Sequence, residues 1–292
     1  MKILDGKKTS QDIKQEIKTE VDGMKARGEK VPHLAAVLVG NDGASLTYVG
    51  SKVRACEQVG FESTLIKMPS TTSETELLKK IEQLNQDDHI DGFIVQLPLP
   101  EQIDTQKVIM AIDPSKDVDG FHPENFGKMA LDMTTFIPAT PFGILELLER
   151  YGVETKGKHT VVIGRSHIVG RPMSILMGRK GFPGNSTVTL THSYTKNIAQ
   201  ITTQADIIIT ALGVPNYLKA EMVKDDAVVI VSGVLTGEHD ALPVGAGFFG
   251  AQRRFVFGVG GQTRVVGGHC SAADVGVADS RIALLRLALL QI

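Results

Sequence analysis

The sequence predicts an α/β protein with parallel sheets, and three observations lead to this class. From residue 10 onward, stretches with helical spacing of apolar residues alternate with short apolar runs, as in βαβ units. Hydrophobic residues make up 42% and charged residues 22% of the 292 residues, which is ordinary for a globular chain. A chain of this length buries about three quarters of its unfolded surface, so its fold needs no disulfide or metal.

The overall charge and the two cysteines exclude several classes of protein. The formal net charge of -2 argues against a strongly basic protein that binds nucleic acid. Cys56 and Cys270 form no CxxC motif or Cys/His cluster, so we predict neither a disulfide framework nor a metal site. The N-terminus lacks an apolar signal-like core, and the chain lacks an apolar run of about 18 residues. We therefore expect a cytoplasmic protein without a membrane or nucleic acid as partner.

The first half of the chain alternates between predicted helices and strands. Ile13, Ile17, Val21 and Met24 recur at helical spacing and predict the first helix. The pattern then predicts a strand at 33–39, a helix at 45–59, a strand at 64–68, a helix opened by a capping box of Ser73 and Glu76, and a strand at 93–97.

The stretch 113–138 is rich in proline and glycine and predicts an irregular loop, suited to an active site and a hinge. After it, Thr140 reads as an N-cap and Pro141 as the first residue of a helix through Leu148. We therefore place one domain at residues 1–138 and a second at 139–275.

Four apolar runs in the second domain predict a doubly wound parallel sheet. They lie at 160–163, 187–191, 207–211 and 227–230, with helical patterns between the first three. Residues 231–292 differ, because no lysine follows Lys224 while 11 of the 30 glycines fall in this last fifth. There, only 280–292 has a clear pattern, that of a helix rich in alanine and leucine.

The strand at 160–163 runs directly into a glycine-containing turn and then a helical pattern, which is where a Rossmann unit places its phosphate loop. Gly164 and Gly170 hold the outer positions, with Ser166 in place of the middle glycine. We expect backbone N–H groups at the helix start to favour an anion. The alternative is an ordinary strand-to-helix turn with a solvated Arg165.

The next strand supports a dinucleotide site and indicates which dinucleotide it binds. It ends in residues 192–195, His-Ser-Tyr-Thr, without the acid that would hold a free ribose 2′-hydroxyl and repel a 2′-phosphate. Arg165 offers a bidentate cation, and Ser166 and Ser193 offer hydroxyl donors. The sequence therefore favours NADP over NAD.

Candidate catalytic residues lie in the first half. Tyr48 and Lys52 are spaced i, i+4, so they share one helix face. Gln96 ends an apolar strand, where α/β sheets place ligand groups, and Asp117 and Asp119 lie in the irregular loop. Each has an ordinary alternative: a partly buried tyrosine, a solvated lysine, a glutamine that caps the strand exit, and turn-forming aspartates.

Several motifs in a fixed order carry a resemblance to a known family. They are Tyr48-Val49-x-x-Lys52, the segment from 82–85 through 95–100, Lys116-Asp117-Val118-Asp119-Gly120, Ala139-Thr140-Pro141, and Gly164-Arg165-Ser166 with Val169, Gly170 and Pro172. Over residues 1 to about 230, the chain resembles the bifunctional methylenetetrahydrofolate dehydrogenase/methenyltetrahydrofolate cyclohydrolase family.

The resemblance implies two reactions on folate one-carbon units. NADP takes a hydride from 5,10-methylenetetrahydrofolate, and water opens the methenyl product to 10-formyltetrahydrofolate. Lys52 would be the central acid–base residue, Tyr48 would stack on or position the folate, Gln96 would hold and tune Lys52, and Asp119 would anchor the pterin. A lysine partly removed from water binds its proton less tightly, and a neutral amide would orient it without a salt bridge.

The resemblance also implies an architecture: an N-terminal α/β folate domain, a Rossmann-like NADP domain with the folate cleft between them, a helix at 276–292 packing back on the first domain, and a homodimer. The implied cofactor-binding residues are Gly164, Arg165, Ser166, Val169, Gly170, Pro172, Ser193 and Val234.

The C-terminal 62 residues depart from the family pattern. Where the family continues its strand as Asp-Val-Gly, this chain has Val231-Ser232-Gly233-Val234, and a later proline–glycine segment is missing. The abrupt change motivates the hypothesis of a shifted reading frame. The alternative function is then a catalytically impaired relic that binds NADP or folate. A different NADP-dependent dehydrogenase is disfavoured, because Tyr48, Lys52 and Gln96 would share no purpose.

Overall fold

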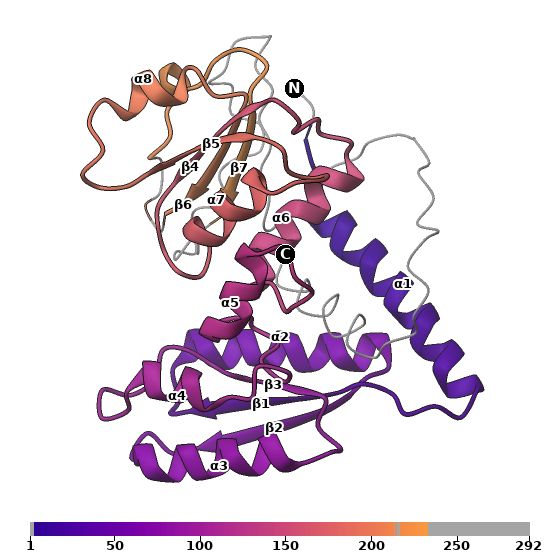
Figure 1. Ribbon diagram of the computed structural model, residues 1–292. Helices are drawn as coiled ribbons and strands as arrows, with labels where there is room; N and C mark the ends of the chain where they lie inside the picture. Colours follow the sequence, from indigo (N-terminus) through magenta and orange to yellow (C-terminus); the bar gives the residue numbers. More distant parts are fainter. Residues whose placement is uncertain (1–2, 213, 215–216, 233–292) are drawn as a thin grey trace. The chain divides into compact units, whose positions relative to one another are not determined.

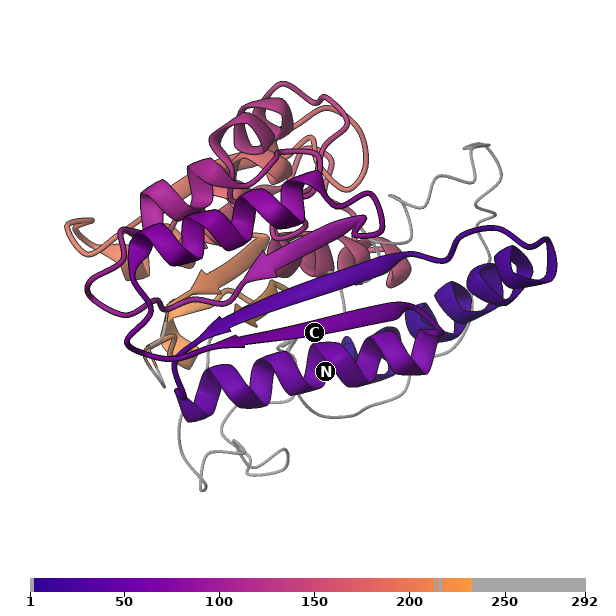
Figure 2. The same cartoon turned by 90° about the horizontal axis from the view of Figure 1, so that it is seen from below.

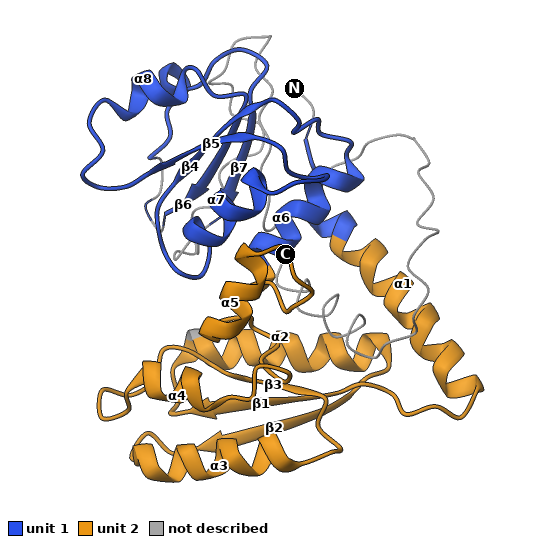
Figure 3. Cartoon of the chain, viewed as in Figure 1, with its two compact units in different colours: residues 1–9, 140–268, 292 blue, residues 10–139, 269–291 orange. Residues whose placement is uncertain are grey.

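The computed structural model describes residues 3–212, 214 and 217–232 (Figure 1). They fall into two compact units with the division between Ala139 and Thr140 (Figure 3). Unit 2 contains Ser10–Ala139, and unit 1 contains residues 3–9 and the described residues from Thr140 onward. Each unit has its own parallel sheet.

The sheet of unit 2 has three strands in the order β2-β1-β3. They are β1 (His33–Val39), β2 (Glu62–Met68) and β3 (Gly92–Val95), and their arrowheads point the same way in Figure 2. The first two confirm the predicted strands. The third ends two residues earlier than predicted, although the Gln96 N–H still donates to the Val37 carbonyl at 2.9 Å.

The helices through the end of unit 2 are α1 (Gly6–Ala26), α2 (Gly43–Val59), α3 (Glu74–Gln86), α4 (Thr105–Ala111) and α5 (Pro123–Ala130). The first three confirm the predictions, and Ile13, Ile17 and Val21 are fully buried. The expectation of an irregular 113–138 segment was wrong at α5, because Pro123 lies in the first turn, where a helix tolerates proline. Both α4 and α5 are too short to show a helical period in sequence.

The predicted capping box of α3 is confirmed. The Ser73 hydroxyl accepts a hydrogen bond from the Glu76 N–H at 3.3 Å, and the Glu76 carboxylate accepts one from the Ser73 N–H at 2.8 Å. These two bonds satisfy donors that would otherwise lack partners at the helix start.

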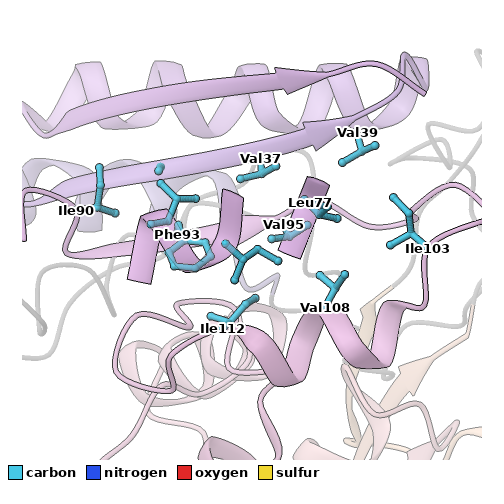
Figure 4. Packing of buried hydrophobic residues seen from close by; sticks show 12 residues of the cluster. Val37, Val39, Leu77, Ile90, Phe93, Val95, Ile103, Val108 and Ile112 are labelled. Atoms are coloured by element: carbon cyan, nitrogen blue, oxygen red, sulfur yellow. The ribbon is translucent and has the colours of Figure 1, made fainter. Parts of the chain in front are cut away.

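Helices cover both faces of the unit 2 sheet. Figure 1 shows α2 on one side and α3 on the other. Figure 4 shows Val37 and Phe93 of the sheet in one buried cluster with Leu77 of α3 and Val108 of α4. The strand β1 is central, because it pairs with β2 on one edge and with β3 on the other.

The sheet of unit 1 has four parallel strands in the order β5-β4-β6-β7. They are β4 (His159–Ile163), β5 (Thr187–Thr191), β6 (Ile207–Ala211) and β7 (Val228–Ser232). This confirms the predicted doubly wound sheet. Its core is a buried cluster that includes Val161, Ile208 and Val229.

The remaining helical elements are α6 (Ala139–Arg150), α7 (Gly170–Gly178), α8 (Ile198–Thr202) and the short 3-10 helix η1 (Ala220–Met222). Because α6 already begins at Ala139, Thr140 lies inside its first turn and not at the predicted N-cap. Pro141 still occupies the first turn, where its missing N–H costs no helical hydrogen bond. Among the helices that the structure describes, none has the length and apolar character needed to cross a bilayer.

Both sheets place the second strand on one side of the first strand and the third strand on the other. The chain therefore changes direction beside β1 in unit 2 and beside β4 in unit 1. In open α/β sheets, ligands bind at the carboxyl ends of the strands at such a switch point. The relevant positions follow β1 and β3 in unit 2, and β4 and β6 in unit 1.

Candidate active site and dinucleotide loop

Lys52 and Asp119 form an ion pair at the switch point of unit 2. The Nζ of Lys52, on α2, lies 3.5 Å from Oδ1 of Asp119, in the loop between α4 and α5, although the residues are 67 positions apart. Their side chains are 13% and 15% exposed. Partial burial lowers the screening of their charges by water, so the pair is more strongly coupled than one on the surface.

The pairing differs from the expectation that Lys52 has a neutral amide partner and no salt bridge. The Gln96 side chain instead donates from Nε2 to the carbonyl oxygen of its neighbour, Leu97, at 2.7 Å. The strand ladder ends just before this carbonyl, and the Gln96 amide satisfies it. The alternative reading of Gln96, as a residue that caps the strand exit, describes this contact.

Tyr48 lies one helical turn before Lys52 on α2, on the same helix face. Val49 and Cys56 of the same helix are buried and fix which side of α2 packs against the sheet. The Tyr48 side chain is 41% exposed, so its ring keeps an apolar surface available to a ligand.

Asp117, two residues before Asp119, is buried. Its Oδ2 accepts hydrogen bonds from the His122 N–H at 2.8 Å and from Asn125 Nδ2 at 2.9 Å. Burial raises the pKa of the Asp117 carboxyl, while these hydrogen bonds oppose the shift. The sequence leaves Asp117 open as a candidate site residue or a turn-forming aspartate. It does not indicate Asn125, because the Asn125 contact arises only when α5 folds against the loop.

The glycines of the dinucleotide loop are required by close backbone contacts. Gly164 follows β4 with a φ of 109°, and a Cβ there would lie 2.6 Å from the Ala211 carbonyl oxygen. A Cβ on Gly170, at the start of α7, would overlap the carbonyl oxygen of Gly164. The loop therefore packs tightly both on the end of β6 and on the start of its own helix.

The expectation of free N–H groups at the start of α7 was wrong. The Ser166 hydroxyl accepts from the N–H groups of Val169 and Gly170 at 3.1 and 3.3 Å, and its carbonyl accepts from Arg171 at 3.0 Å. Pro172 has no N–H. The Ser166 hydroxyl thus acts as an internal cap, although its own hydrogen can still be donated to a ligand.

Free donors lie instead in the loop before the helix. Within the described part of the chain, the backbone N–H groups of residues 165–168 have no hydrogen-bond partner, and all four residues are exposed. Consecutive N–H groups of this kind form an anion-binding surface. The sequence showed the loop but not which of its amides the helix would use.

Arg165 and Ser193 lie at the carboxyl ends of neighbouring strands. The Gly164 N–H donates to the Thr191 carbonyl at 2.9 Å, which ties the loop to the end of β5, and both Arg165 and Ser193 are exposed. Residues 192–195 include no acid, and the turn closes through a bond from the His192 N–H to the Thr195 hydroxyl. This donor set fits a phosphorylated ribose. Val234 lies outside the described residues.

The described residues contain no group of three or more His, Cys, Asp or Glu that could hold a metal ion. The candidate site residues themselves offer an amine, carboxylates, an amide and hydroxyl groups.

Two family models match the chain. The catalytic domain of tetrahydrofolate dehydrogenase/cyclohydrolase matches residues 4–119, and the NAD(P)-binding domain of the same family matches residues 138–250. The second match extends past residue 230, where the sequence resemblance was expected to end.

Relatives and solved structures agree with these matches. The chain is 88% identical to the bifunctional protein FolD of Flavobacterium psychrophilum over 234 aligned residues. These residues cover 80% of each chain. The crystal structure of FolD from Campylobacter jejuni is similar with a TM-score of 0.81, 35% identity and coverage of 99% of this chain and 97% of that one. A FolD from Trypanosoma brucei, in complex with NADP cofactor and an inhibitor, is similar with a TM-score of 0.81 and 27% identity, covering 99% and 94%. The chain belongs to the tetrahydrofolate dehydrogenase/cyclohydrolase family.

Proposed function

We propose that the chain oxidises 5,10-methylenetetrahydrofolate to 5,10-methenyltetrahydrofolate with NADP and hydrolyses the product to 10-formyltetrahydrofolate. The carrying observation is the ion pair of Lys52 and Asp119 at the switch point of the unit that the catalytic-domain model matches. Unit 1, matched by the NAD(P)-binding model, supplies the dinucleotide loop.

In the hydrolysis, a water oxygen bonds to the methenyl carbon, a proton leaves that water, and a carbon–nitrogen bond of the five-membered ring breaks. The formyl group stays on N10 as its carbonyl forms. The second proton of the water passes from the oxygen to the released nitrogen, and the first proton leaves to solvent. The Lys52 amine accepts and returns protons at these steps. Asp119 anchors the pterin and holds the Lys52 Nζ, and the exposed Tyr48 ring positions the folate.

Gln96 acts at the strand exit, where its backbone N–H extends the pairing with β1 and its side chain fixes the Leu97 carbonyl. In this role, it shapes the edge beside which the folate ring binds. This role differs from the direct contact with Lys52 that the resemblance implied, because the Gln96 Nε2 donates to the Leu97 carbonyl.

When bound, NADP supplies the hydride acceptor for the oxidation. The free N–H groups of residues 165–168 would hold its diphosphate, and the Arg165 guanidinium and the hydroxyl groups of Ser166 and Ser193 would hold the 2′-phosphate. The proposed cofactor-binding residues are Gly164, Arg165, Ser166, Val169, Gly170, Pro172, Ser193 and Val234. The NADP complex of the Trypanosoma brucei FolD supports this choice of cofactor.

We also propose that the protein acts in the cytoplasm and as a homodimer. For the first, the two cysteines, Cys56 and Cys270, form no disulfide framework in the sequence, which supports a reducing compartment such as the cytoplasm. The second follows from the family resemblance, and sedimentation equilibrium of the purified chain measures it.

The test is an assay of the full chain with 5,10-methylenetetrahydrofolate and NADP, followed by the absorbance of NADPH and of the methenyl product. We expect both reactions, and we expect Lys52→Met to lower cyclohydrolase turnover by at least about 100-fold, as for loss of a general acid–base. Lys79→Met, which replaces an exposed lysine of α3, is the matched control. Full turnover by Lys52→Met would exclude Lys52 as the catalytic residue.

The relic hypothesis is not favoured, because the catalytic and NAD(P)-binding models both match the chain. The intact mass of the assayed protein, 31.4 kDa for this sequence, ensures that any turnover belongs to this chain with its own C-terminal residues. A chain of this mass that binds NADP without turnover of either folate would support the relic instead.

A further inference from the structure

The loop that carries Asp119 is clamped to the sheet before it reaches the active site. The Phe93 N–H donates to the Lys116 carbonyl at 2.9 Å, so the loop pairs with β3 as a short parallel bridge. Gly92 makes this approach possible, because a Cβ there would overlap Val118. The Lys116 ammonium donates to two carbonyl groups near the end of α3, at 2.9 and 2.8 Å.

The buried Asp117 carboxylate forms its hydrogen bonds with residues that follow Asp119 in the chain. It accepts from the His122 N–H and from the Asn125 side chain, and the backbone of Phe121 donates to it as well. The Gly120 N–H donates to the Asp117 backbone carbonyl at 3.1 Å. Asp117 therefore binds the chain on the far side of Asp119, which closes Asp119 into a turn with both ends held.

A second row of contacts supports the carboxylate. Asn125 also donates to the Pro114 carbonyl at 2.9 Å, and the Thr135 hydroxyl donates to Asn125 Oδ1 at 2.7 Å. Gly120 has a φ of 67°, and a Cβ there would lie 2.9 Å from the Phe136 carbonyl oxygen. The turn therefore packs against residues 136–138 with no room for a side chain at Gly120.

The two aspartates have opposite surroundings. Asp119 pairs with Lys52, and 15% of its side chain is exposed. Asp117 is only 2% exposed, and its carboxylate accepts hydrogen bonds from the His122 N–H and from Asn125. A group as buried as Asp117 does not touch a folate. Its effect on the reaction has to pass through the geometry of its neighbour.

We propose that Asp117 is a positioning residue: through its bonds to His122 and Asn125, it sets the Asp119 carboxylate at the distance from which it holds the Lys52 Nζ. The proposal rests on the proposed function, since it assigns Asp117 to the same reaction. A carboxylate is needed at position 117 because its neighbours donate hydrogen bonds to it. The His122 N–H and the Asn125 side chain donate to Oδ2, and the backbone of Phe121 donates as well. An amide would present its NH₂ group to such donors.

The first measurement compares Asp117→Asn with Asp88→Asn, the same change at an exposed turn of unit 2. We expect Asp117→Asn to lower kcat/KM by about 10-fold to 100-fold, as for misplacement of a reacting group by about 1 Å. Circular dichroism selects a temperature at which both variants are folded. Asp88→Asn is expected to match the wild type.

A double-mutant cycle separates positioning from general destabilisation. If Asp117 acts through Asp119, then adding Asp117→Asn to an Asp119→Asn protein changes kcat/KM by no more than about twofold, the usual error of additivity. A role confined to stability would instead lower the active fraction in both backgrounds by the same factor. That second result would overturn the proposal.

A readout without turnover distinguishes failure of this proposal from failure of the proposed function. The rate at which an amine-selective reagent modifies Lys52, followed by peptide mass spectrometry, reports how firmly Asp119 holds the ammonium. We expect faster modification in Asp117→Asn and Asp119→Asn, with no further gain in the double variant and none in Asp88→Asn. An unchanged rate in Asp117→Asn would overturn the positioning role even if the enzyme were inactive on folates.

Thr135→Val gives a milder form of the test, in case Asp117→Asn does not fold. It keeps the side-chain volume and removes only the hydroxyl that donates to Asn125. We expect a smaller increase in Lys52 modification in the same direction. An unchanged Lys52 rate in a folded Thr135→Val protein would count against the network.

Discussion

Gly170 contacts Gly164 so closely that the first helical residue of α7 has no room for a side chain above the carbonyl group of the loop. This contact fixes the path of the dinucleotide loop from the end of β4 into the helix. The loop amides keep their direction only while both glycines remain.

Gly170→Ala is expected to destabilise the protein by about 1–3 kcal/mol, since the added methyl group overlaps backbone that cannot move aside. We also expect weaker NADP binding, because the loop must shift. Urea unfolding and a titration with NADP measure the two effects. The control is Gly178→Ala in the same helix, where a Cβ would make an ordinary 3.8 Å contact with Val188. Equal effects of the two substitutions would contradict this explanation.

Arg165→Ala is expected to weaken NADP binding by about 10-fold to 100-fold, the loss of a hydrogen bond to a charged group, while NAD binding changes little. The reason is that only NADP carries the 2′-phosphate. Dissociation constants for both cofactors give the ratio. Arg171→Ala removes an exposed arginine in the first turn of α7 and serves as the control. A uniform loss for both cofactors would place Arg165 at another phosphate.

Ser73→Ala is expected to cost about 1 kcal/mol of unfolding free energy, because it removes the hydroxyl half of the capping box on α3. Thr75→Ala, at an exposed position in the first turn, is the matched control. Urea denaturation of both variants measures the difference. A Ser73→Ala protein as stable as the Thr75→Ala protein would mean that the box contributes nothing.

The ionisation of Asp206 makes the free energy of unfolding depend on pH in the acid range. Burial opposes ionisation, but the hydrogen bond from Lys224 at 2.6 Å, the His159 N–H and the charge of Lys158 outweigh it and lower the pKa of the carboxyl below its ordinary 3.8. The unfolded chain then binds the proton more readily than the folded one. The stabilisation is therefore present above pH 3.8 and is lost as the pH falls through the folded pKa.

Urea unfolding of the wild type and of Asp206→Asn over this acid range checks the sign. We expect the stability difference between them to shrink as the pH falls, while the Asp88→Asn protein follows the wild type. A stability difference between the wild type and Asp206→Asn that increased as the pH fell would contradict the lowered pKa of Asp206.

The sequence predicts the regular elements well where the physics is local. The strand at 33–39 has the bounds of β1 because a continuous apolar run lies between polar turns. The capping box follows from two residues three positions apart. By contrast, α4 and α5 contain seven and eight residues, and the contacts that stabilise them, such as Val108 in the core, come from distant segments.

The candidate residues are visible in sequence, but their partners are not. Whether Lys52 meets Gln96 or Asp119 depends on how the loop between α4 and α5 folds back onto the sheet. Gly92, Asp117 and Asn125 decide its path. Similarly, Ser166 reads as a ligand donor, while the structure also uses its hydroxyl to cap α7. Hydrogen bonds between distant residues carry no periodic signal.

The contact of Gly120 with residues 136–138 has a consequence for remodelling the chain. A Cβ on Gly120 would lie 2.9 Å from both the Phe136 oxygen and the Pro138 nitrogen, so a residue inserted at 136–138 pushes directly on the turn beside Asp119. Residues 131–134 are exposed and could absorb an insertion at their own surface. The stretch that leads into α6 therefore limits where the turn with Asp119 can lie, and the length of this stretch is as constrained as its composition.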